Sequence, residues 1–197
     1  MRRMSRGLRQ AAMVLAGAGL LSGLGTAEAA DVSAASRAEP VVIIIDGYTQ
    51  TVRESAGTPV LCPTNQVLLG RAHSGDENGN TTYYCGIILI DGRLVHVSAP
   101  TWSASQRESN SFFSAPANHP LVGRQHTGDE NGQTRYASAS LTLDGGPVTL
   151  SSYYWTPSQR ESSSYSKAGP GEVMTGRQHI GDENGQTSYQ YARVTVQ

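Results

Sequence analysis

Short apolar runs, separated by Gly, Ser, Asn and Pro, follow one another from residue 41 to the end of the chain. The runs are rich in β-branched residues, and none of them has the periodicity of an amphipathic helix. This alternation of short strands and turn residues predicts an all-β domain with roughly nine to twelve strands.

Two pairs of these runs predict β-hairpins, with turns at Asp91-Gly92 and at Asp144-Gly145-Gly146. The paired runs are 85–91 with 94–98 and 137–144 with 148–151. A third pair is divided between the two chain ends, 191–197 and 41–46. We therefore expect the N- and C-terminal strands to pair and close the domain, since an open array of repeats would expose its edges.

A fourteen-residue block occurs three times, and each copy begins 53 residues after the previous one. The copies span 70–83, 123–136 and 176–189, and they share the pattern Gly-Arg-x-His-x-Gly-Asp-Glu-Asn-Gly-x-Thr-x-Tyr. A second block, an aromatic residue followed by x-x-Ser/Thr-x-Arg-Glu-Ser, starts at Tyr48, Trp102 and Trp155. Three repeats of about this length predict a pseudo-threefold, β-prism-like domain with three small sheets around an axis.

The N-terminal segment has the three parts of a secretory signal peptide. A basic start is followed by the apolar run Ala11–Leu24 and by the small-residue cleavage signal Ala27-Glu28-Ala29. The apolar run is too short to span a bilayer. We therefore predict a signal peptide at 1–30, a disordered leader at 31–40, one domain at 41–197, no transmembrane segment and an extracellular location.

Charge and cysteine content narrow the function classes. Cleavage after Ala30 removes four arginines and one glutamate, which leaves eleven basic and fifteen acidic residues. A chain with a net negative charge lacks the basic surface that nucleic acids require, so no nucleic-acid partner is expected. Cys62 and Cys85 are expected to form a disulfide after export.

The repeated block has a purely structural interpretation. Asn-Gly is a strong signal for a two-residue hairpin turn, so each block would form one hairpin, as at Asn131-Gly132. In such a hairpin Asp129 would face Thr134 and Glu130 would face Gln133. Trp102 and Trp155 fit core positions better than ligand platforms, and Arg107-Glu108 and Arg160-Glu161 would brace neighbouring strands by ion pairing.

The functional interpretation starts from residues that a turn does not require. Carboxylates, amides, arginines and aromatic rings are the groups that bind sugar hydroxyls and apolar sugar faces. Three equivalent sites would gain affinity through avidity at a cell surface. The candidate ligand-binding residues are Arg71, His73, Asp76, Glu77, Asn78 and Tyr83, then Arg124, His126, Asp129, Glu130, Asn131 and Tyr136, then Arg177, His179, Asp182, Glu183, Asn184 and Tyr189.

Calcium is a further option, because Asp-Glu-Asn-Gly has the oxygen-rich character of calcium loops. Asp76, Asp129 and Asp182 would be its ligands, although no cofactor is required by the sequence. Enzymatic activity is not expected. The chain has no nucleophile elbow, zinc-protease motif or phosphate loop, and a triplicated catalytic site would be unusual.

The repeated block resembles the repeat of β-tripod domains, which lie at the C-terminus of some insecticidal pore-forming proteins of the membrane-attack-complex/perforin kind. The resemblance covers nearly all of residues 41–197. It implies a threefold β domain that recognises the target cell through the loops around Asp76, Asp129 and Asp182. This chain departs from those proteins because it has no room for a pore-forming domain, so the resemblance implies a free-standing targeting module.

These observations predict a secreted, lectin-like recognition module whose partner is a cell-surface glycan or glycoprotein. The alternative is a secreted interaction or defence protein that binds a protein partner. In that case the repeated loops would be structural or stabilised by calcium.

Overall fold

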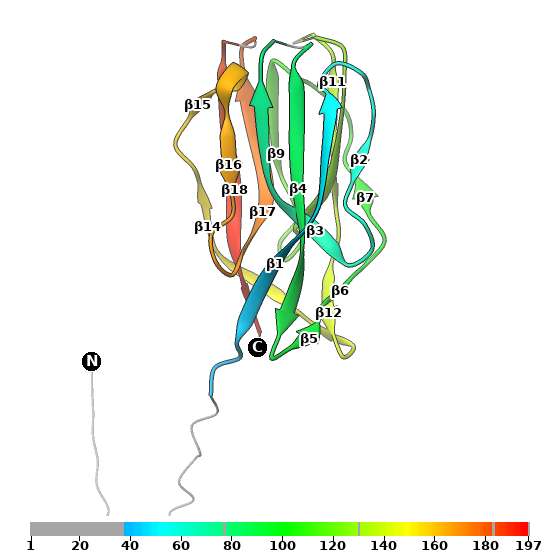
Figure 1. Cartoon of the computed structure of the whole chain (residues 1–197), viewed down its shortest axis with the longest axis vertical. Helices are drawn as coiled ribbons and strands as arrows, with labels where there is room; N and C mark the ends of the chain where they lie inside the picture. The colour runs from blue at the N-terminus through cyan, green and yellow to red at the C-terminus, as the bar shows by residue number, and fades with distance from the viewer. Residues whose placement is uncertain (1–37, 77, 130, 183, 197) are drawn as a thin grey trace, which may run out of the picture. The chain divides into compact units, whose positions relative to one another are not determined.

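The computed structural model describes residues 38–76, 78–129, 131–182 and 184–196. Within these residues the regular elements are β-strands and one 3-10 turn, η1 (Glu161–Ser163), and the strands form four antiparallel sheets (Figure 1). The prediction of an all-β fold is confirmed. The predicted signal peptide, most of the predicted leader, and Glu77, Glu130 and Glu183 lie outside the described residues.

The first sheet has the order β1-β4-β3-β16, with β5 pairing β4. Its strands are β1 (Val42–Arg53), β4 (Asn80–Ile90), β3 (Gln66–Ser74), β16 (Tyr165–Lys167) and β5 (Arg93–Leu94). The second sheet has the order β2-β10-β11-β7, with β8 pairing β11. Its strands are β2 (Val60–Leu61), β10 (Leu121–Thr127), β11 (Gln133–Ser138), β7 (Thr101–Trp102) and β8 (Gln106–Arg107).

The third large sheet has the order β14-β18-β17-β9, with β15 pairing β18. Its strands are β14 (Thr149–Trp155), β18 (Gln186–Thr195), β17 (Glu172–Ile180), β9 (Asn110–Ser114) and β15 (Gln159–Arg160). A small sheet joins β13 (Gly146–Pro147), β12 (Leu141–Leu143) and β6 (His96–Val97). The described residues therefore hold eighteen strands, more than predicted, because several of them are only two residues long.

Each large sheet is completed by a strand from a neighbouring repeat. The hairpin of the first block, β3–β4, takes its edge strand β16 from the chain that follows the third Arg-Glu-Ser block. In the same way β2 pairs the second hairpin and β9 pairs the third. The repeats are thereby interlocked by strand exchange.

The prediction that the chain ends pair is wrong for the described residues. β1 pairs with β4 alone, and β18 lies between β14 and β17. Because β18 has a partner strand on each side, most of its length offers no free edge to β1. The ends of the described domain are nevertheless neighbours, since Glu39, Pro40 and Val42 line the same surface groove, of about 490 Å³, as residues 193–196.

The predicted turn at Asp91-Gly92 is confirmed, and the second turn is Asp144-Gly145, because Gly146 already belongs to β13. Beyond these turns the predicted runs pair elsewhere, β6 with β12 and β14 with β18. Ile90 faces Arg93 across the first turn, and Leu143 faces Gly146 across the second. Positive φ angles of 50° at Asp91 and 75° at Gly92 allow the chain to reverse within two residues. Asp144 and Gly145 repeat this geometry, with φ angles of 49° and 81°.

Apolar side chains from the sheets form two buried clusters. The first contains aliphatic residues from all four sheets, for example Val67, Val122, Leu141 and Val194. The second is rich in aromatic rings and includes Tyr83, Tyr136, Tyr189 and Tyr191. The described part of the chain has no helix with the length and hydrophobicity needed to cross a bilayer.

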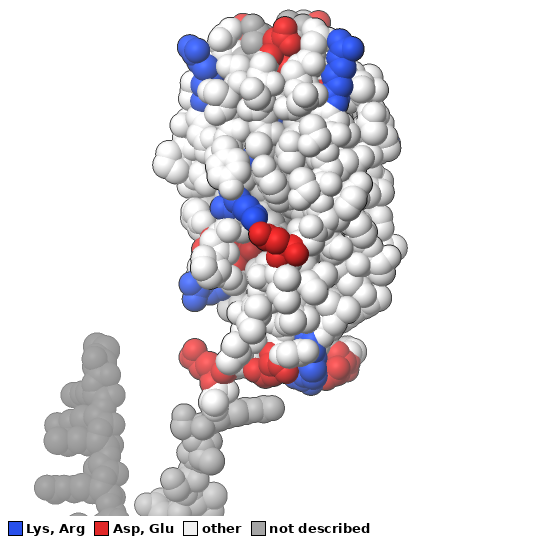
Figure 2. Space-filling model, viewed as in Figure 1, with Lys and Arg blue, Asp and Glu red and all other residues white. Residues whose placement is uncertain are grey.

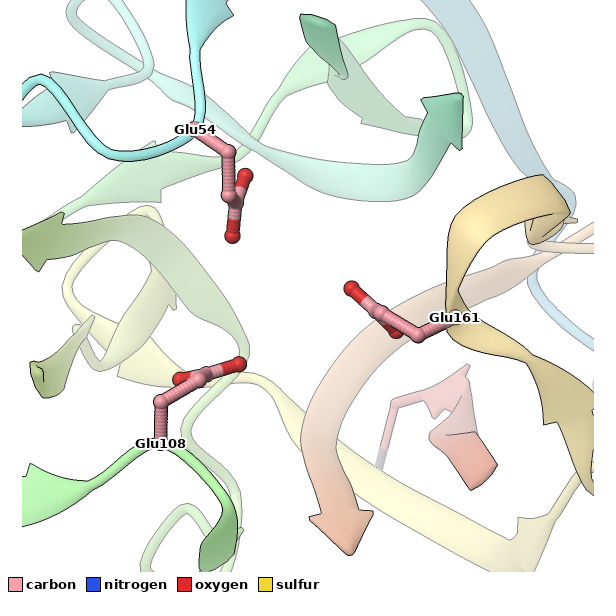
Figure 3. Close-up of side chains that lie close together, drawn as sticks. All are labelled: Glu54, Glu108 and Glu161. Atoms are coloured by element: carbon pink, nitrogen blue, oxygen red, sulfur yellow. The ribbon is translucent and has the colours of Figure 1, made fainter. Parts of the chain in front are cut away.

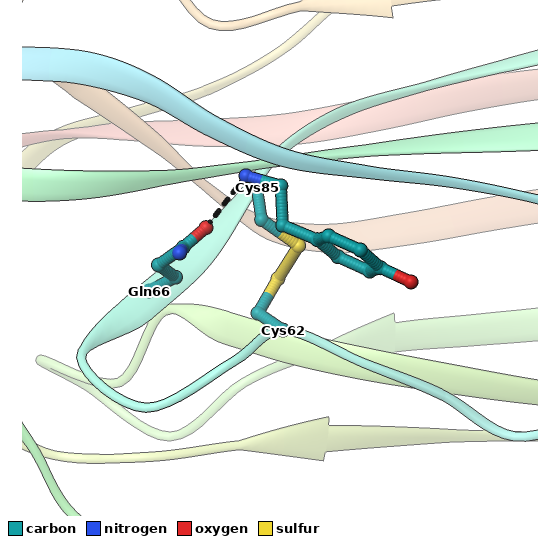
Figure 4. The surroundings of a disulfide bond; sticks show 4 residues. Cys62, Gln66 and Cys85 are labelled. Carbon is teal, nitrogen blue, oxygen red and sulfur yellow. Dashed lines mark hydrogen bonds between the residues drawn. A yellow bond between two sulfur atoms is a disulfide. The ribbon is translucent and has the colours of Figure 1, made fainter.

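The predicted disulfide is confirmed: Cys62 and Cys85 are bonded, with their Cα atoms 5.7 Å apart (Figure 4). The bond ties β4 to the segment that follows β2. Beside it, Gln66 Oε1 accepts a hydrogen bond of 2.8 Å from the Tyr48 backbone, which joins β3 to the bulge of β1. The bridge is a local staple in the first repeat, since Ala115 and Ser138 stand at the corresponding positions of the second.

Replacing both cysteines with alanine is expected to lower the free energy of unfolding by about 3 kcal/mol, because the bridge closes a loop of intermediate length. The bridged residues are 23 positions apart. Urea denaturation of the double variant and of the reduced native protein measures this loss, and the two should agree. A denaturation midpoint equal to that of the oxidised protein would contradict the prediction.

Candidate functional site

The three repeated blocks form hairpins with five-residue tips, at 75–79, 128–132 and 181–185. The two-residue Asn-Gly turn is therefore a wrong prediction. Thr127 faces Gln133 and His126 faces Thr134, so Asp129 belongs to the tip itself. The left-handed residue is the first glycine of each tip, with φ angles of 105°, 89° and 101°.

The second glycine of each tip is required for a different reason. A Cβ atom on Gly132 would lie 1.9 Å from the backbone oxygen of Thr127, and Gly79 and Gly185 are crowded in the same way. Within each tip the Asp Oδ1 accepts a hydrogen bond from the backbone of the residue two positions later, at 2.8 to 2.9 Å. The three tips thus share one local hydrogen-bonding pattern.

The Arg-Glu-Ser blocks join these tips to one another. The backbone N–H of Glu54, Glu108 and Glu161 donates to the last glycine of the tip in its own repeat, at 2.9 Å in each case. The serine carbonyl that follows accepts from the first glycine of the next tip, at 2.9 to 3.1 Å. Ser55 reaches the second tip, Ser109 the third and Ser162 the first, so the contacts close into a cycle.

Beneath the tips, three arginines and three glutamates alternate in a closed ring, here called the buried ring: Arg71, Glu54, Arg124, Glu108, Arg177 and Glu161. Each arginine lies between two carboxylates, at nitrogen–oxygen distances of 2.5 to 3.1 Å. Figure 3 shows the three carboxylates pointing toward one another from separate parts of the chain. All six side chains are buried.

The tyrosines, threonines and histidines of the repeated block surround the buried ring. The hydroxyl groups of Tyr83, Tyr136 and Tyr189 accept hydrogen bonds from the arginines at 2.8 to 3.2 Å. The histidine Nδ1 atoms lie 3.7 to 4.0 Å from the carboxylates. On the other side of the imidazole, Nε2 of His73 and of His179 hydrogen-bonds the first glycine carbonyl of its tip at 3.0 Å. The histidines therefore connect the ring to the tips.

Charge in the buried ring is balanced, three positive groups against three negative ones. Burial disfavours the charged form of Glu161, but Arg177 and Arg71 outweigh burial and lower the pKa of this carboxyl to about 2. The same two opposing effects leave the pKa values of Glu54 and Glu108 below their usual range. Arg124 and Arg177 each have a nitrogen in ion-pair contact that makes no hydrogen bond of ordinary geometry, so Coulomb attraction is the main stabilising term there.

The three histidines are held neutral. Burial lowers their pKa values, and the adjacent arginine lowers them further, to about 4 for His179. A neutral imidazole can accept and donate one hydrogen bond each. With a single N–H, the imidazole of His73 and of His179 donates from Nε2 to the glycine carbonyl at 3.0 Å, while Nδ1 faces the carboxylate at 3.7 to 4.0 Å without donating to it.

The structure divides the eighteen predicted ligand-binding residues into two groups. Nine are buried and cannot touch a ligand at the surface, so their assignment to the binding site is corrected: Arg71, Arg124, Arg177, His73, His126, His179, Tyr83, Tyr136 and Tyr189. Six are exposed at the tips: Asp76, Asp129, Asp182, Asn78, Asn131 and Asn184. The side chains of Glu77, Glu130 and Glu183 lie outside the described residues.

Sequence reasoning missed the glutamates of the buried ring as partners of the repeated arginines. The signal was present, because each Arg-Glu-Ser block recurs with the same period as the arginines. The predicted bracing by ion pairs was partly correct: the glutamates do brace the strands, but with Arg71, Arg124 and Arg177. The neighbouring arginines, Arg53 and Arg107, instead donate to Asn78 and Asn131 at the tips.

Among the described residues, the acidic groups close enough to share a cation are Glu54, Glu108 and Glu161, whose carboxylate oxygens lie within 4.8 Å of one another. Three guanidinium groups already neutralise these carboxylates, so the donor set does not fit a divalent ion. The predicted calcium ligands Asp76, Asp129 and Asp182 belong to separate tips and form no such group with other described residues.

The tips lie together at one end of the domain, opposite the end at which β1 begins and β18 ends (Figure 1). Figure 2 shows acidic side chains at this end between basic ones, and further acidic side chains at the opposite end of the domain. Exposed carboxylate, amide and guanidinium groups therefore recur here on a support whose interior is fixed by the buried ring. A comparison of the chain with protein-family models, with curated proteins and with solved structures gives no match.

Proposed function

We propose that this protein is a secreted recognition module that binds a cell-surface glycan through its three hairpin tips. The observation that carries the proposal is the threefold recurrence of one exposed set, an aspartate and an asparagine on the same tip geometry. The Cys62–Cys85 disulfide supports export to an oxidising compartment.

The chemistry of the exposed set suits hydroxyl groups. A carboxylate accepts hydrogen bonds from two neighbouring hydroxyls, while amide and guanidinium groups donate to their oxygens. Arg53 and Arg107 hold the Asn78 and Asn131 amide oxygens, which fixes the orientation of these amides. Fixed donors and acceptors lose little conformational entropy on binding.

A pseudo-threefold, β-prism-like or β-tripod arrangement is part of the proposal. The cyclic contacts of the Arg-Glu-Ser blocks and the alternating buried ring support it. Three equivalent tips on one end of a rigid body would engage a repeating glycan at several points. Each contact would be weak, and their combination would provide avidity.

The experiment is a glycan array probed with the labelled mature chain in calcium buffer and, in parallel, in EDTA. We expect selective binding to a small group of related glycans. Loss of that binding in EDTA alone would assign calcium to the tips, whereas equal binding in both buffers would leave the protein side chains as the whole site. An array without binding in either buffer would contradict glycan recognition.

The second candidate is a protein partner, with the repeated block serving only the fold. The burial of the arginine, histidine and tyrosine of every copy favours this alternative, because three of the six predicted binding residues in each copy are used internally. We propose binding and not catalysis for either candidate, since the histidines that would act as bases lie beneath the surface beside arginines.

A further inference from the structure

The outer faces of two of the three large sheets carry an exposed aromatic ring at equivalent positions. Phe112 on β9 and Tyr165 on β16 are 53 residues apart, and each is 58% exposed. In strand register Phe112 faces Gln178 and Tyr165 faces Ala72, which are themselves equivalent positions of the repeat. A ring left this exposed contributes little to the core, so its recurrence calls for another explanation.

Both rings are held by one equivalent backbone contact and by an aromatic partner that comes from a different repeat position in each case. The backbone N–H of Phe112 donates to Gln106 Oε1, and that of Tyr165 to Gln159 Oε1, at 2.8 Å in each case. Each ring also packs against a half-buried aromatic side chain. Phe112 lies 5.3 Å from Trp155, and Tyr165 lies 6.2 Å from Tyr84, between ring centroids.

A pair of hydroxyl groups accompanies each aromatic pair. Thr51 and Thr82 hydrogen-bond each other at 2.8 Å on the first sheet. Ser158 and Ser188 occupy the equivalent positions on the third large sheet, with their oxygens 3.2 Å apart, and of these two Ser158 is exposed while Ser188 is buried. Thr82 faces Ala72 and Ser188 faces Gln178, so one strand, β3 or β17, lies between the exposed ring and the nearer hydroxyl of each pair.

The second sheet lacks both the exposed aromatic ring and the hydroxyl pair, and it shows that the fold does not require them. Pro59 precedes Val60, which pairs with Arg124, and so it stands where Phe112 and Tyr165 stand on the other sheets. Arg135 replaces the hydroxyl, and its guanidinium carbon lies 4.7 Å from the Trp102 ring centroid. Gln125 holds this guanidinium at 2.8 Å. On the second sheet Arg135 therefore covers the outer face, and this sheet forms without an exposed aromatic ring.

We propose that the outer faces of the first and third large sheets are carbohydrate-binding platforms, distinct from the hairpin tips. Each platform stacks one pyranose ring on its aromatic pair. The apolar face of a pyranose would pack on Phe112 or Tyr165, and hydroxyls of the bound sugar chain would reach Ser158 on the third large sheet or Thr51 and Thr82 on the first. The choice of carbohydrate as the ligand rests on the proposed function, whereas the position of the platforms rests on the exposed aromatic rings. Two platforms on separate sheets would favour a polymer over a single sugar.

Trp155 provides a local readout for the platform on the third large sheet. The chain has two tryptophans, so Trp102→Phe leaves Trp155 as the one fluorophore of its kind. We would titrate this variant with short soluble oligomers of glucose, mannose, galactose, xylose and N-acetylglucosamine. A saturable change in Trp155 emission is expected with one oligomer class. A panel that leaves the emission unchanged would overturn the proposal.

Substitutions then separate the platforms from the tips. In the Trp102→Phe background Phe112→Ala should weaken the fluorescence response about tenfold, the change that 1.4 kcal/mol of lost contact produces. Tyr165→Ala, on the other sheet, and Pro59→Ala, the matched control, should leave the response intact. Thermal melting checks that each variant is folded, which is expected because all three side chains are exposed.

The triple variant Asp76→Ala/Asp129→Ala/Asp182→Ala distinguishes this proposal from the proposed function. It should keep the Trp155 response, because the platform does not include the tips. If Phe112→Ala retains full affinity, the platform is overturned while binding at the tips stands. If the triple variant keeps full binding on the array and Phe112→Ala/Tyr165→Ala loses it, the tips fail and the platforms stand.

Discussion

Replacing Glu108 with alanine is expected to cost about 3–5 kcal/mol of the free energy of unfolding, because the change breaks a buried ion pair from one side. Arg124 would keep Glu54 and Arg177 would keep Glu161, but the buried ring would then hold three positive groups against two negative ones, with one positive charge uncompensated. A loss of this size is a large part of the stability of an ordinary domain, roughly 5–15 kcal/mol. We therefore expect low secretion or early thermal melting.

The control for this substitution is Arg107→Ala, one position earlier on an exposed side chain. It removes a contact to Asn131 at the second tip and should leave the melting temperature nearly unchanged. Glu108→Gln tests the charge separately, since it keeps the side-chain shape and one hydrogen-bond acceptor. If the melting temperature of Glu108→Ala equals that of the native protein, the buried ring does not stabilise the fold and our account of the repeated arginines is wrong.

Acidification is expected to destabilise the protein in two stages. The pKa of His179 is lowered to about 4 in the folded protein, so the unfolded chain binds its proton first as the pH falls. Stability is thus fully present above the ordinary histidine pKa, about 6.5, and declines from there toward pH 4. A shift of this size corresponds to roughly 3 kcal/mol for one buried histidine.

The second stage involves the carboxylates. The pKa of Glu161 is about 2 when folded, below its ordinary value of 4.5, so its contribution is present above that value and is lost as the pH falls toward 2. Urea denaturation at a series of pH values measures both stages. His179→Gln should reduce the loss between pH 6.5 and 4, whereas His96→Gln, at an exposed position, should not. An unfolding free energy that stays constant from pH 7 to pH 4 would contradict the prediction.

Features set by local sequence were predicted correctly. Asp91-Gly92 and Asp144-Gly145 form the expected turns because positive φ is a property of the residues themselves. The disulfide was predicted because the chain has two cysteines and a signal-like N-terminus. The all-β fold followed from the length and composition of the apolar runs.

Features that depend on distant contacts were not predicted. Asn131-Gly132 looked like a two-residue turn, but positive φ at Gly128 extends the tip to five residues. Arg124 looked like a surface ligand-binding residue, because its carboxylate partners come from two other places in the chain, Glu54 and Glu108. Burial of a charged residue depends on partners that a local pattern does not reveal.

The chain ends illustrate the same limit. Repeat symmetry suggested that the split third hairpin would close by strand pairing, as β4–β5 and β12–β13 do. The structure instead leaves a groove there, since β18 pairs with β14 and β17 while β1 pairs with β4. No hairpin turn connects these two strands, and such a turn fixes the register in the other two copies.

The central claim is that the buried half of the repeated block holds the fold while the exposed half binds the ligand. The most direct measurement compares array binding and thermal melting of the native protein with those of Asp76→Ala/Asp129→Ala/Asp182→Ala. The account predicts that the triple variant loses binding by more than about tenfold, equivalent to 1.4 kcal/mol, and keeps its melting temperature within a few degrees. Unchanged binding, or early melting of the triple variant, would contradict it, because the exposed aspartates would then serve no ligand or would serve the fold.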